Sequence, residues 1–297
     1  MSADKKTTAS VPFWIALLCI VILCGVLAFS VLTSGPGTAP YLQSAQQPAA
    51  ATGFPGYSGA SSLALPGSVC PSVIGAAPVT PPATEALDRE TLVMARPPAA
   101  DRVNYTDRGF SEPVEASVAW WMSPGFMDNT TEFRGYERTT AGGKSGYPEE
   151  HRVFFTFIEH SLDTAEQQST LMHGMTLFRG INPSVAGTVL NTSEYREPAF
   201  ASTSYDITFS LDAFGLRSPD GYRNMLVLRR DPGDHALYIN EDEREYLLPR
   251  GMTWSVVKVE NVQNLSVNAD FPLHNRTTNT TSFDHVRLIY ITGKSCA

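Results

Sequence analysis

Residues 175–251 decide the fold, and they hold three short polar elements, each at the start or the end of an apolar run. Residues 177–180 read Leu-Phe-Arg-Gly, residues 200–204 read Phe-Ala-Ser-Thr-Ser, and residues 243–251 read Glu-Arg-Glu-Tyr-Leu-Leu-Pro-Arg-Gly. Taken alone, each has an ordinary explanation: a turn after a strand, hydroxyls paired along a strand edge, or a solvated charged loop. Their joint occurrence, in this order and with these apolar contexts, favours a functional site.

Around these elements the sequence predicts helices followed by strands. Residues 149–167 carry apolar side chains at helical spacing, namely Val153, Phe154, Phe157, Ile158 and Leu162. Short apolar runs bounded by Gly, Pro, Asn and Asp predict strands at 175–179, 199–203, 224–228, 245–248, 253–259 and 286–291. Helices grouped before strands predict an α+β fold.

The N-terminal region predicts a membrane anchor. Residues 12–33 contain an uncharged, mostly apolar run, and about 20 such residues are needed to cross the hydrocarbon core. Lys5 and Lys6 precede the run and the next basic residue is Arg89, so the positive-inside rule predicts a cytosolic tail at 1–11. A cleaved signal peptide is the alternative, although its apolar core is usually only about 7–15 residues. We expect a single-pass type II membrane protein whose remaining chain is extracellular or lumenal.

The segment that follows the anchor predicts a stalk. Residues 34–100 are rich in Gly, Pro, Ala and Ser, and carry no charge before Glu85. Such a segment cannot bury enough apolar surface to offset the entropy of ordering, so we expect disorder there and a folded domain at 101–297. Sequons for N-glycosylation support translocation of this domain, and they begin at Asn104, Asn129, Asn191, Asn264, Asn275 and Asn279.

Composition and motifs exclude several classes of protein. The formal net charge of −8 argues against a general nucleic-acid binder. No Cys/His cluster has metal-ligand spacing, so we expect no metal. No Gly-x-Gly-x-x-Gly stretch lies between a strand and a helix, so a Rossmann domain is not indicated. Cys70 and Cys296 would reach an oxidising compartment, where the sequence leaves open whether they pair together, pair between chains or stay free.

The three elements resemble those of the Arg-Ser-Glu class of mono-ADP-ribosyltransferases, which includes clostridial-type toxins and vertebrate ecto-enzymes. That family has, in order, a strand Arg, a Ser-Thr-Ser strand and a Glu- or Gln-x-Glu pair. They match Arg179, the Ser202-Thr203-Ser204 stretch and the Glu243-x-Glu245 pair. The resemblance covers about 130–297 and is strong over 175–260. It implies N-terminal helices packed on two small mixed or antiparallel sheets that form an NAD cleft.

Two further segments carry the resemblance, and one feature departs from it. Residues 235–239 resemble the strand that enters the family's target-recognition loop, and Tyr136 matches a family aromatic in the helical part. Vertebrate ecto-enzymes usually carry internal disulfides, whereas the predicted domain contains only Cys296. The Leu-Leu-Pro-Arg-Gly tail is closer to the toxin-like branch.

The resemblance implies roles that suit the chemistry of NAD. Breaking the nicotinamide–ribose bond produces a positively charged, oxocarbenium-like transition state, which the carboxylate of Glu245 would stabilise. Arg179 would bind the pyrophosphate, and Ser202 would orient both side chains by hydrogen bonds. Gly180 would let the backbone approach the nicotinamide. The predicted NAD-binding set also includes Thr203, Ser204 and Phe209.

Phe209 lies in segment 205–216, which matches the family's phosphate–nicotinamide loop, where an aromatic ring can stack on nicotinamide. The alternative is that Phe209 and Phe214 both belong to the core. Residues i and i+2 of an extended strand face the same side, so Glu243 is expected to share the cleft with Glu245 and meet the acceptor.

In the resembling family, Glu at the first position of the pair goes with arginine acceptors. The resemblance therefore implies transfer of ADP-ribose from NAD to arginine side chains of a target protein, with release of nicotinamide. Two alternatives remain: an NAD glycohydrolase, with water as acceptor, and a catalytically inactive stalked surface glycoprotein that acts as a binding module.

Overall fold

The computed structural model describes residues 84–123, 126–139 and 141–294. All of them belong to the larger of the two units into which the chain divides, Leu65–Ala297. The smaller unit, Met1–Ala64, lies outside the described residues.

Several predictions therefore fall on residues that the structure does not describe. These are the cytosolic tail at 1–11, the anchor at 12–33, the stalk over 34–83, and both Cys70 and Cys296. Within the described ranges, no helix combines the length and the apolar character that crossing a membrane requires.

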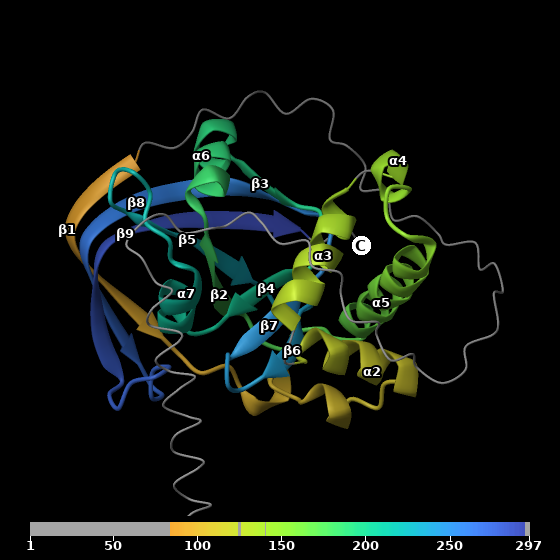
Figure 1. Ribbon diagram of the computed structural model, residues 1–297. Coiled ribbons are helices and arrows are strands. Elements are labelled where there is room, and N and C mark those ends of the chain that lie inside the picture. Colours follow the sequence, from red (N-terminus) through yellow and green to blue (C-terminus); the bar gives the residue numbers. More distant parts are fainter. Residues whose placement is uncertain (1–83, 124–125, 140, 295–297) are drawn as a thin grey trace, which may run out of the picture. The chain divides into compact units, whose positions relative to one another are not determined.

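Helices dominate the first part of the described chain (Figure 1). Two short 3-10 turns, η1 (Ala99–Asp101) and η2 (Tyr105–Asp107), precede α2 (Glu112–Trp121), α3 (Phe126–Arg138), α4 (Ala141–Lys144) and α5 (Glu149–Gln167). The helix predicted at 149–167 is confirmed at both ends. It begins after Pro148, and the carboxylates of Glu149 and Glu150 in its first turn complement the positive end of the helix dipole.

The buried face of α5 differs from the apolar stripe read in the sequence. Phe155, Ile158 and Leu162 are buried, but Val153 is 66% exposed and Phe157 is 37% exposed. The helical period was therefore right, while two of its apolar side chains point toward solvent.

The nine strands of the described residues form one mixed sheet, which corrects the expectation of two separate sheets. Its strands are β1 (Thr84–Met94), β2 (Met175–Ile181), β3 (Glu194–Glu197), β4 (Ala201–Ser204), β5 (Arg223–Arg230), β6 (Leu237–Asn240), β7 (Glu245–Leu248), β8 (Met252–Ala269) and β9 (Thr280–Lys294). The order is β1-β8-β9-β5-β2-β4-β7-β6, with β3 paired to β8. One part of the sheet contains β1, β8, β9, β5 and β2, and the other contains β4, β7 and β6. The two parts meet between β2 and β4, which share a single residue pair, Phe178 with Ser204.

Among the described residues the core consists of two hydrophobic clusters. The larger cluster packs around β2, β5, β8 and β9 with α6 (Pro183–Thr192) and α7 (Ile207–Phe214). The smaller cluster lies between the helices α2, α3 and α5 and the opposite face of β6 and β7, and it includes Phe200 just before β4. Along β7, Tyr246 and Leu248 enter the larger cluster while Leu247 enters the smaller one. The strands β6 and β7 are therefore buried on both faces.

The predicted stalk, residues 34–100, extends too far toward the C-terminus, because residues 84–94 form a strand. β1 pairs in parallel with β8, from Thr84 opposite Val259 to Met94 opposite Ala269, so the described fold begins 17 residues before the expected Asp101 (101 − 84 = 17). β1 is an edge strand, and its backbone pairing contributes stability without an apolar periodicity that a sequence pattern could reveal.

All the strands predicted from the sequence are present, but several begin or end at residues that differ from the predicted bounds. β8 and β9 extend well beyond the predicted 253–259 and 286–291, while β3 was not predicted. The order of helices before strands holds only in part, since α6 and α7 lie between strands.

Candidate active site

Arg179 lies at the joint between the two parts of the sheet. Its Nη1 donates to the carbonyl oxygen of Ser202 at 2.6 Å, and its Nη2 donates to Oε2 of Glu197 at 3.1 Å. The side chain is only 12% exposed. The single pair between β2 and β4 thus brings the first two sequence elements into contact.

Glu197 was not singled out in the sequence, although it is the most heavily bonded carboxylate near Arg179. It accepts hydrogen bonds from Nε and Nη2 of Arg138 at 3.1 and 2.9 Å, from the Tyr195 hydroxyl at 2.9 Å, and from the Ala199 amide at 3.2 Å. Burial opposes its ionisation, but the charges of Arg179 and Arg138 outweigh burial and lower its pKa. A lone Glu on a four-residue strand carries no sequence signal.

Glu245 is the first residue of β7 and is 5% exposed. Its Oε1 accepts from Nε1 of Trp121 at 3.3 Å, its Oε2 accepts from Nδ2 of Asn240 at 3.4 Å, and the Ser202 side chain bonds to it as well. Burial raises the pKa of Glu245, and the bonds from Ser202 and Trp121 oppose that rise. Ser202 therefore contacts both partners assigned to it, Arg179 through its carbonyl and Glu245 through its side chain.

Glu243 does not lie on an extended strand, which corrects the reasoning that paired it with Glu245. Residues 241–244 form a turn, and Arg244 has a φ of 54°, in the left-handed region. The same-side rule for residues i and i+2 therefore does not apply. Glu243 is exposed, yet burial of its carboxyl and then the charge of Glu245 raise its pKa. The two carboxylates are thus near enough to interact.

The hydroxyls of Thr203 and Ser204 are occupied within the protein. Thr203 Oγ1 donates to the Tyr246 carbonyl at 2.8 Å, and Ser204 Oγ donates to the Glu243 carbonyl at 2.9 Å. Both residues are buried. They hold β4 against β7 and its preceding turn, so the structure gives no support to their predicted contact with NAD.

Gly180 is required by packing against α7. A Cβ atom at this position would lie 2.7 Å from Cβ of Phe214 and 2.8 Å from the Ser210 carbonyl oxygen. This close approach explains the glycine without any ligand.

Phe209 lies on α7, where a loop was expected. Its ring centroid is 6.0 Å from that of Phe214 and 4.9 Å from that of His274. Phe209 is half-buried and Phe214 is 45% exposed, so the alternative that both belong to the core is wrong for Phe214.

Arg134 on α3 is a further site residue that the sequence did not reveal. Its guanidinium lies over the Trp121 ring, 5.0 Å from the centroid, and its buried Nε has no hydrogen-bond partner among the described residues. Burial, and then the charge of Arg179, lower its pKa to about 10, while the charges of Glu245 and Glu197 act in the opposite direction. Arg134 therefore lies within the same electrostatic environment as the predicted site.

The site as a whole combines three guanidiniums, of Arg134, Arg138 and Arg179, with two carboxylates, of Glu197 and Glu245. Such a cluster suits a ligand with two phosphate charges, because planar guanidiniums bind phosphate oxygens in pairs.

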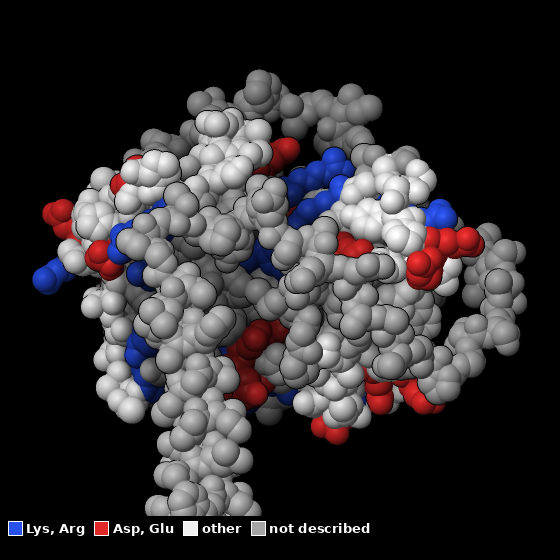
Figure 2. All heavy atoms as spheres, in the orientation of Figure 1, with Lys and Arg blue, Asp and Glu red and all other residues white. Residues whose placement is uncertain are grey.

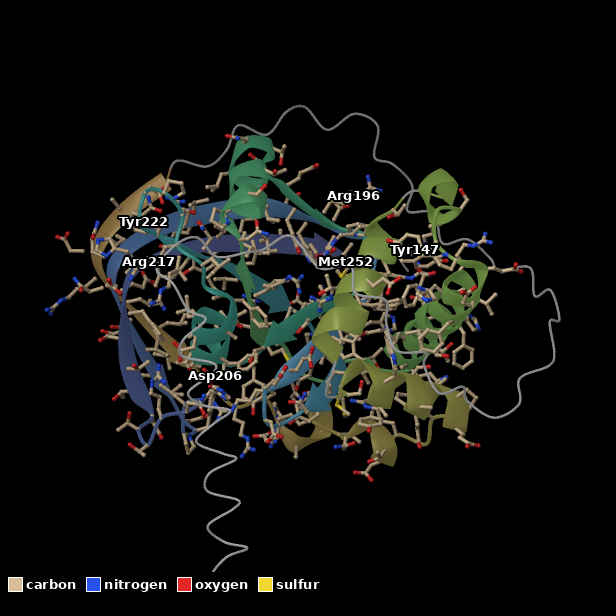
Figure 3. All side chains as sticks on the ribbon, in the orientation of Figure 1. Tyr147, Arg196, Asp206, Arg217, Tyr222 and Met252 are labelled. Carbon is tan, nitrogen blue, oxygen red and sulfur yellow. The ribbon has the colours of Figure 1, made fainter. Side chains whose placement is uncertain are left out.

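A pocket of about 670 Å³ opens beside this cluster, between α6 and the strands β2 and β3. Arg138, Arg179, Gly180 and Glu197 line one side of it, and Arg196 contributes a further basic side chain. Figure 2 shows basic side chains gathered in the recess between α6 and α4, and Figure 3 labels Arg196 there. Glu245 does not line this pocket, so the pocket covers only the arginine end of the predicted site.

No group of three or more His, Cys, Asp or Glu side chains in the described part of the chain could hold a metal ion.

Comparison with known proteins gives matches only among solved structures, since no family model and no curated protein matches the chain. It is similar to the enzymatic component C2-I of the C2-toxin from Clostridium botulinum, at 12% identity with a TM-score of 0.43. This match covers 64% of the chain but only 46% of C2-I.

Two other matches cover nearly the whole of the other chain. Plx2a, an ADP-ribosyltransferase toxin from Paenibacillus larvae, matches at 14% identity and a TM-score of 0.44, over 65% of this chain and 92% of Plx2a. C3stau2 from S. aureus with NAD matches at 15% identity and a TM-score of 0.40, over 64% of this chain and 91% of C3stau2. An ADP-ribosyltransferase toxin is thus among the structures that this chain resembles. At these identities and TM-scores, the argument for function rests on the chain's own residues.

Proposed function

We propose that the domain is an NAD-dependent mono-ADP-ribosyltransferase that transfers ADP-ribose to arginine side chains and releases nicotinamide. The observation that carries this proposal is the buried Glu245 carboxylate, which Trp121 and Ser202 hold beside a cluster of guanidiniums. Such a carboxylate can face a developing positive charge, while the guanidiniums can hold a pyrophosphate.

In the proposed reaction, the bond between ribose C1′ and the nicotinamide nitrogen breaks, and nicotinamide leaves with the electron pair. Positive charge develops on the ribose, and ionised Glu245 stabilises it. Low solvent exposure strengthens this interaction, because water screens charges poorly in a buried site. The charges of Arg134 and Arg179 help to keep Glu245 ionised by lowering its pKa against the effect of burial.

The pyrophosphate would bind at Arg179 and Arg134. Both side chains have a buried Nε without a hydrogen-bond partner among the described residues, and a phosphate oxygen would satisfy such donors. The neighbouring pocket of about 670 Å³ has the size of typical ligand pockets, about 300–1,000 Å³, and would take the rest of the ADP moiety.

Glu243 would meet the acceptor. Glu243 is an exposed residue, and its carboxylate can pair with an arginine guanidinium and direct one nitrogen toward ribose C1′. That nitrogen forms the new bond and loses one proton. The raised pKa of Glu243 suits acceptance of this proton, because a more basic carboxylate binds it more readily.

We also propose that the domain is extracellular or lumenal, as the type II anchor at 12–33 implies. Five sequon asparagines have described side chains, and all five are exposed: Asn104, Asn191, Asn264, Asn275 and Asn279. Exposure is what attachment of a glycan requires.

The test uses the full chain, expressed in glycosylating cells and incubated in detergent with labelled NAD and agmatine, a small guanidine acceptor. Wild type should release nicotinamide and label agmatine. Glu245→Gln should abolish both activities, whereas Glu243→Gln should keep NAD cleavage and lose the labelling. Glu150→Gln, which changes an exposed carboxylate in the first turn of α5, is the control and should behave as wild type.

Other results would select the alternatives. Nicotinamide release without labelled agmatine would indicate an NAD glycohydrolase or a different acceptor. Neither product from a folded protein would indicate a binding module.

A further inference from the structure

We propose that the turn at residues 240–244, here called the acceptor loop, is held in its working position by two charged clamps on either side of Glu243, one centred on Glu241 and one on Arg244. This inference rests on the proposed transferase function. It assigns positioning roles to residues outside the three sequence elements that resemble the family.

The first clamp joins the acceptor loop to the segment that follows β1. The Glu241 carboxylate pairs with Nη2 of Arg96 and accepts from Nη1 of Arg102 at 3.2 Å. It also accepts from the hydroxyls of Tyr205 at 3.0 Å and Tyr238 at 2.5 Å. Although burial opposes its ionisation, these tyrosine bonds and the Arg96 charge outweigh burial and lower the pKa of Glu241. Four donors therefore fix an otherwise exposed carboxylate.

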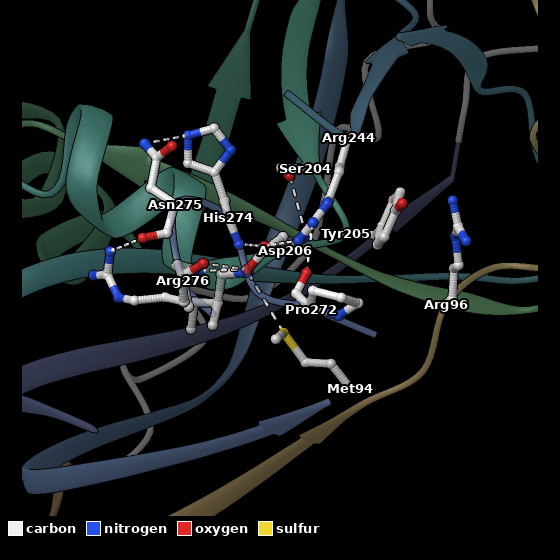
Figure 4. A network of polar contacts seen from close by, with 12 residues as sticks. Met94, Arg96, Ser204, Tyr205, Asp206, Arg244, Pro272, His274, Asn275 and Arg276 are labelled. Atoms are coloured by element: carbon white, nitrogen blue, oxygen red, sulfur yellow. Dashed lines mark hydrogen bonds and ion pairs between the residues drawn. The ribbon is translucent and has the colours of Figure 1, made fainter. Parts of the chain in front are cut away.

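The second clamp joins the acceptor loop to α7 and to the segment before β9 (Figure 4). Nη1 of Arg244 pairs with Oδ2 of Asp206, and its Nη2 donates to the Pro272 carbonyl at 2.5 Å. The guanidinium also lies over the Phe271 ring, 4.9 Å from the centroid. Arg244 adopts a φ of 54°, which an L-residue rarely adopts without compensating contacts. The ion pair and the stacking supply these contacts.

Asp206 makes the second clamp rigid. It is fully buried, and it caps α7 by accepting from the Thr208 amide at 2.8 Å. Its Oδ2 also accepts from the His274 amide at 2.8 Å. One carboxylate thus fastens Arg244 to a helix N-terminus and to a distant segment.

Between the clamps, the backbone of Glu243 is fixed, although Glu243 is an exposed residue. The Glu243 amide donates to Oδ1 of Asn240 at 2.7 Å, and its carbonyl accepts from Ser204 Oγ at 2.9 Å. Glu245 accepts one bond of 3.4 Å from Asn240 in the acceptor loop, but its other contacts, with Trp121 and Ser202, lie outside the loop. Loosening either clamp should therefore displace Glu243 and leave Glu245 in place.

This separation predicts a selective loss. A displacement of about 1 Å at a reacting group can reduce a rate about 100-fold. Transfer to an acceptor should be sensitive to the clamps, whereas cleavage of NAD by water should not.

The experiment compares Arg244→Gln and Glu241→Gln in the full chain with wild type. For each protein, nicotinamide release is measured without acceptor, and kcat/KM for agmatine is measured by labelling. We expect kcat/KM for agmatine to fall at least about tenfold, with release of nicotinamide within about threefold of wild type.

Two further variants separate positioning from folding. Arg276→Gln breaks the nearby 2.8 Å ion pair between Arg276 and Asp212. This pair belongs to neither clamp, so the variant should release nicotinamide and label agmatine as wild type does. Arg96→Gln removes one donor to Glu241, and the Arg96 side chain is 43% exposed. This variant should lose labelling of agmatine and keep nicotinamide release, with an unchanged melting temperature.

Two results would overturn the inference while the transferase function stands. One is an equal loss of both activities in Arg244→Gln, Glu241→Gln and Arg96→Gln, which a purely structural role would give. The other is labelling of agmatine at the wild-type rate in all three. A wild-type chain that releases no nicotinamide would instead overturn the proposed function, and the acceptor role of the loop with it.

Discussion

Glu197→Gln is the most informative single change, because Glu197 joins two guanidiniums of the candidate site. Its carboxylate is 4% exposed and accepts hydrogen bonds from Arg138, Arg179, Tyr195 and the Ala199 amide. Glutamine has nearly the same shape, so the change removes the negative charge and leaves the packing intact. Both guanidiniums would then lose their anionic partner.

The expected cost follows from the burial of each partner. Removing one member of a buried ion pair costs about 3–5 kcal/mol, since the other charge remains unpaired. The Arg138 side chain is 45% exposed and can turn to water, whereas Arg179 is 12% exposed and cannot. We therefore expect the lower end of the range, about 3 kcal/mol. A domain of this size should lose about 6–12 °C in Tm.

The assay is urea unfolding at several pH values, with Glu194→Gln on the same strand as the control. Glu194 is exposed, so its change should stay within about 0.5 kcal/mol. The pKa of Glu197 is lowered by folding, so its stabilisation is complete above its ordinary value of 4.5 and is lost as the pH falls through the depressed pKa. The difference in the free energy of unfolding between wild type and variant should therefore close at acid pH. A gap below about 1 kcal/mol at pH 7, or a gap independent of pH, would refute the reasoning.

Three other changes test separate parts of the structure. Burial raises the pKa of Glu245 above 4.5 and the Arg134 charge opposes this rise, so NAD cleavage should be lost as the pH falls through that pKa. Arg134→Gln removes the opposing charge and should move the acidic limb of the pH–rate profile to higher pH. Burial raises the pKa of Glu166 well above 4.5, so the folded state binds more protons and its stability falls as the pH rises; Glu166→Gln should be more stable than wild type at pH 8 and equal to it at pH 4 in urea unfolding. Gly180→Ala would place a methyl group 2.7 Å from Cβ of Phe214 and should cost about 1–3 kcal/mol, measured by thermal unfolding with and without NAD.

Local patterns were sufficient for the strands that carry the site. Each of β2, β4 and β7 carries its polar residues beside an apolar run, and each appears near its predicted position. Arg179, Ser202 and Glu245 were singled out because their order along the chain resembles that of a known family, and each lies on one of these strands. The structure brings Ser202 into contact with both Arg179 and Glu245.

Residues contributed by other elements could not be predicted in the same way. Trp121 and Arg134 come from helices whose own sequences show only ordinary amphipathic character, and Glu197 comes from a four-residue strand. Each acquires its role from a neighbour far away in the chain. The turn at Arg244 was misjudged because its left-handed φ depends on partners at Asp206 and Pro272.

The sequence by itself determined the α+β character, the α5 helix and the three polar elements, because these depend on periodicity and order over a few residues. Only the tertiary structure decided that the strands form one sheet, that β1 belongs to it, and that the hydroxyls of Thr203 and Ser204 face the protein. Pairing partners, burial and the charge environment arise between segments distant in the chain. No local pattern encodes them, since the same residues could be satisfied by water until the fold excludes it.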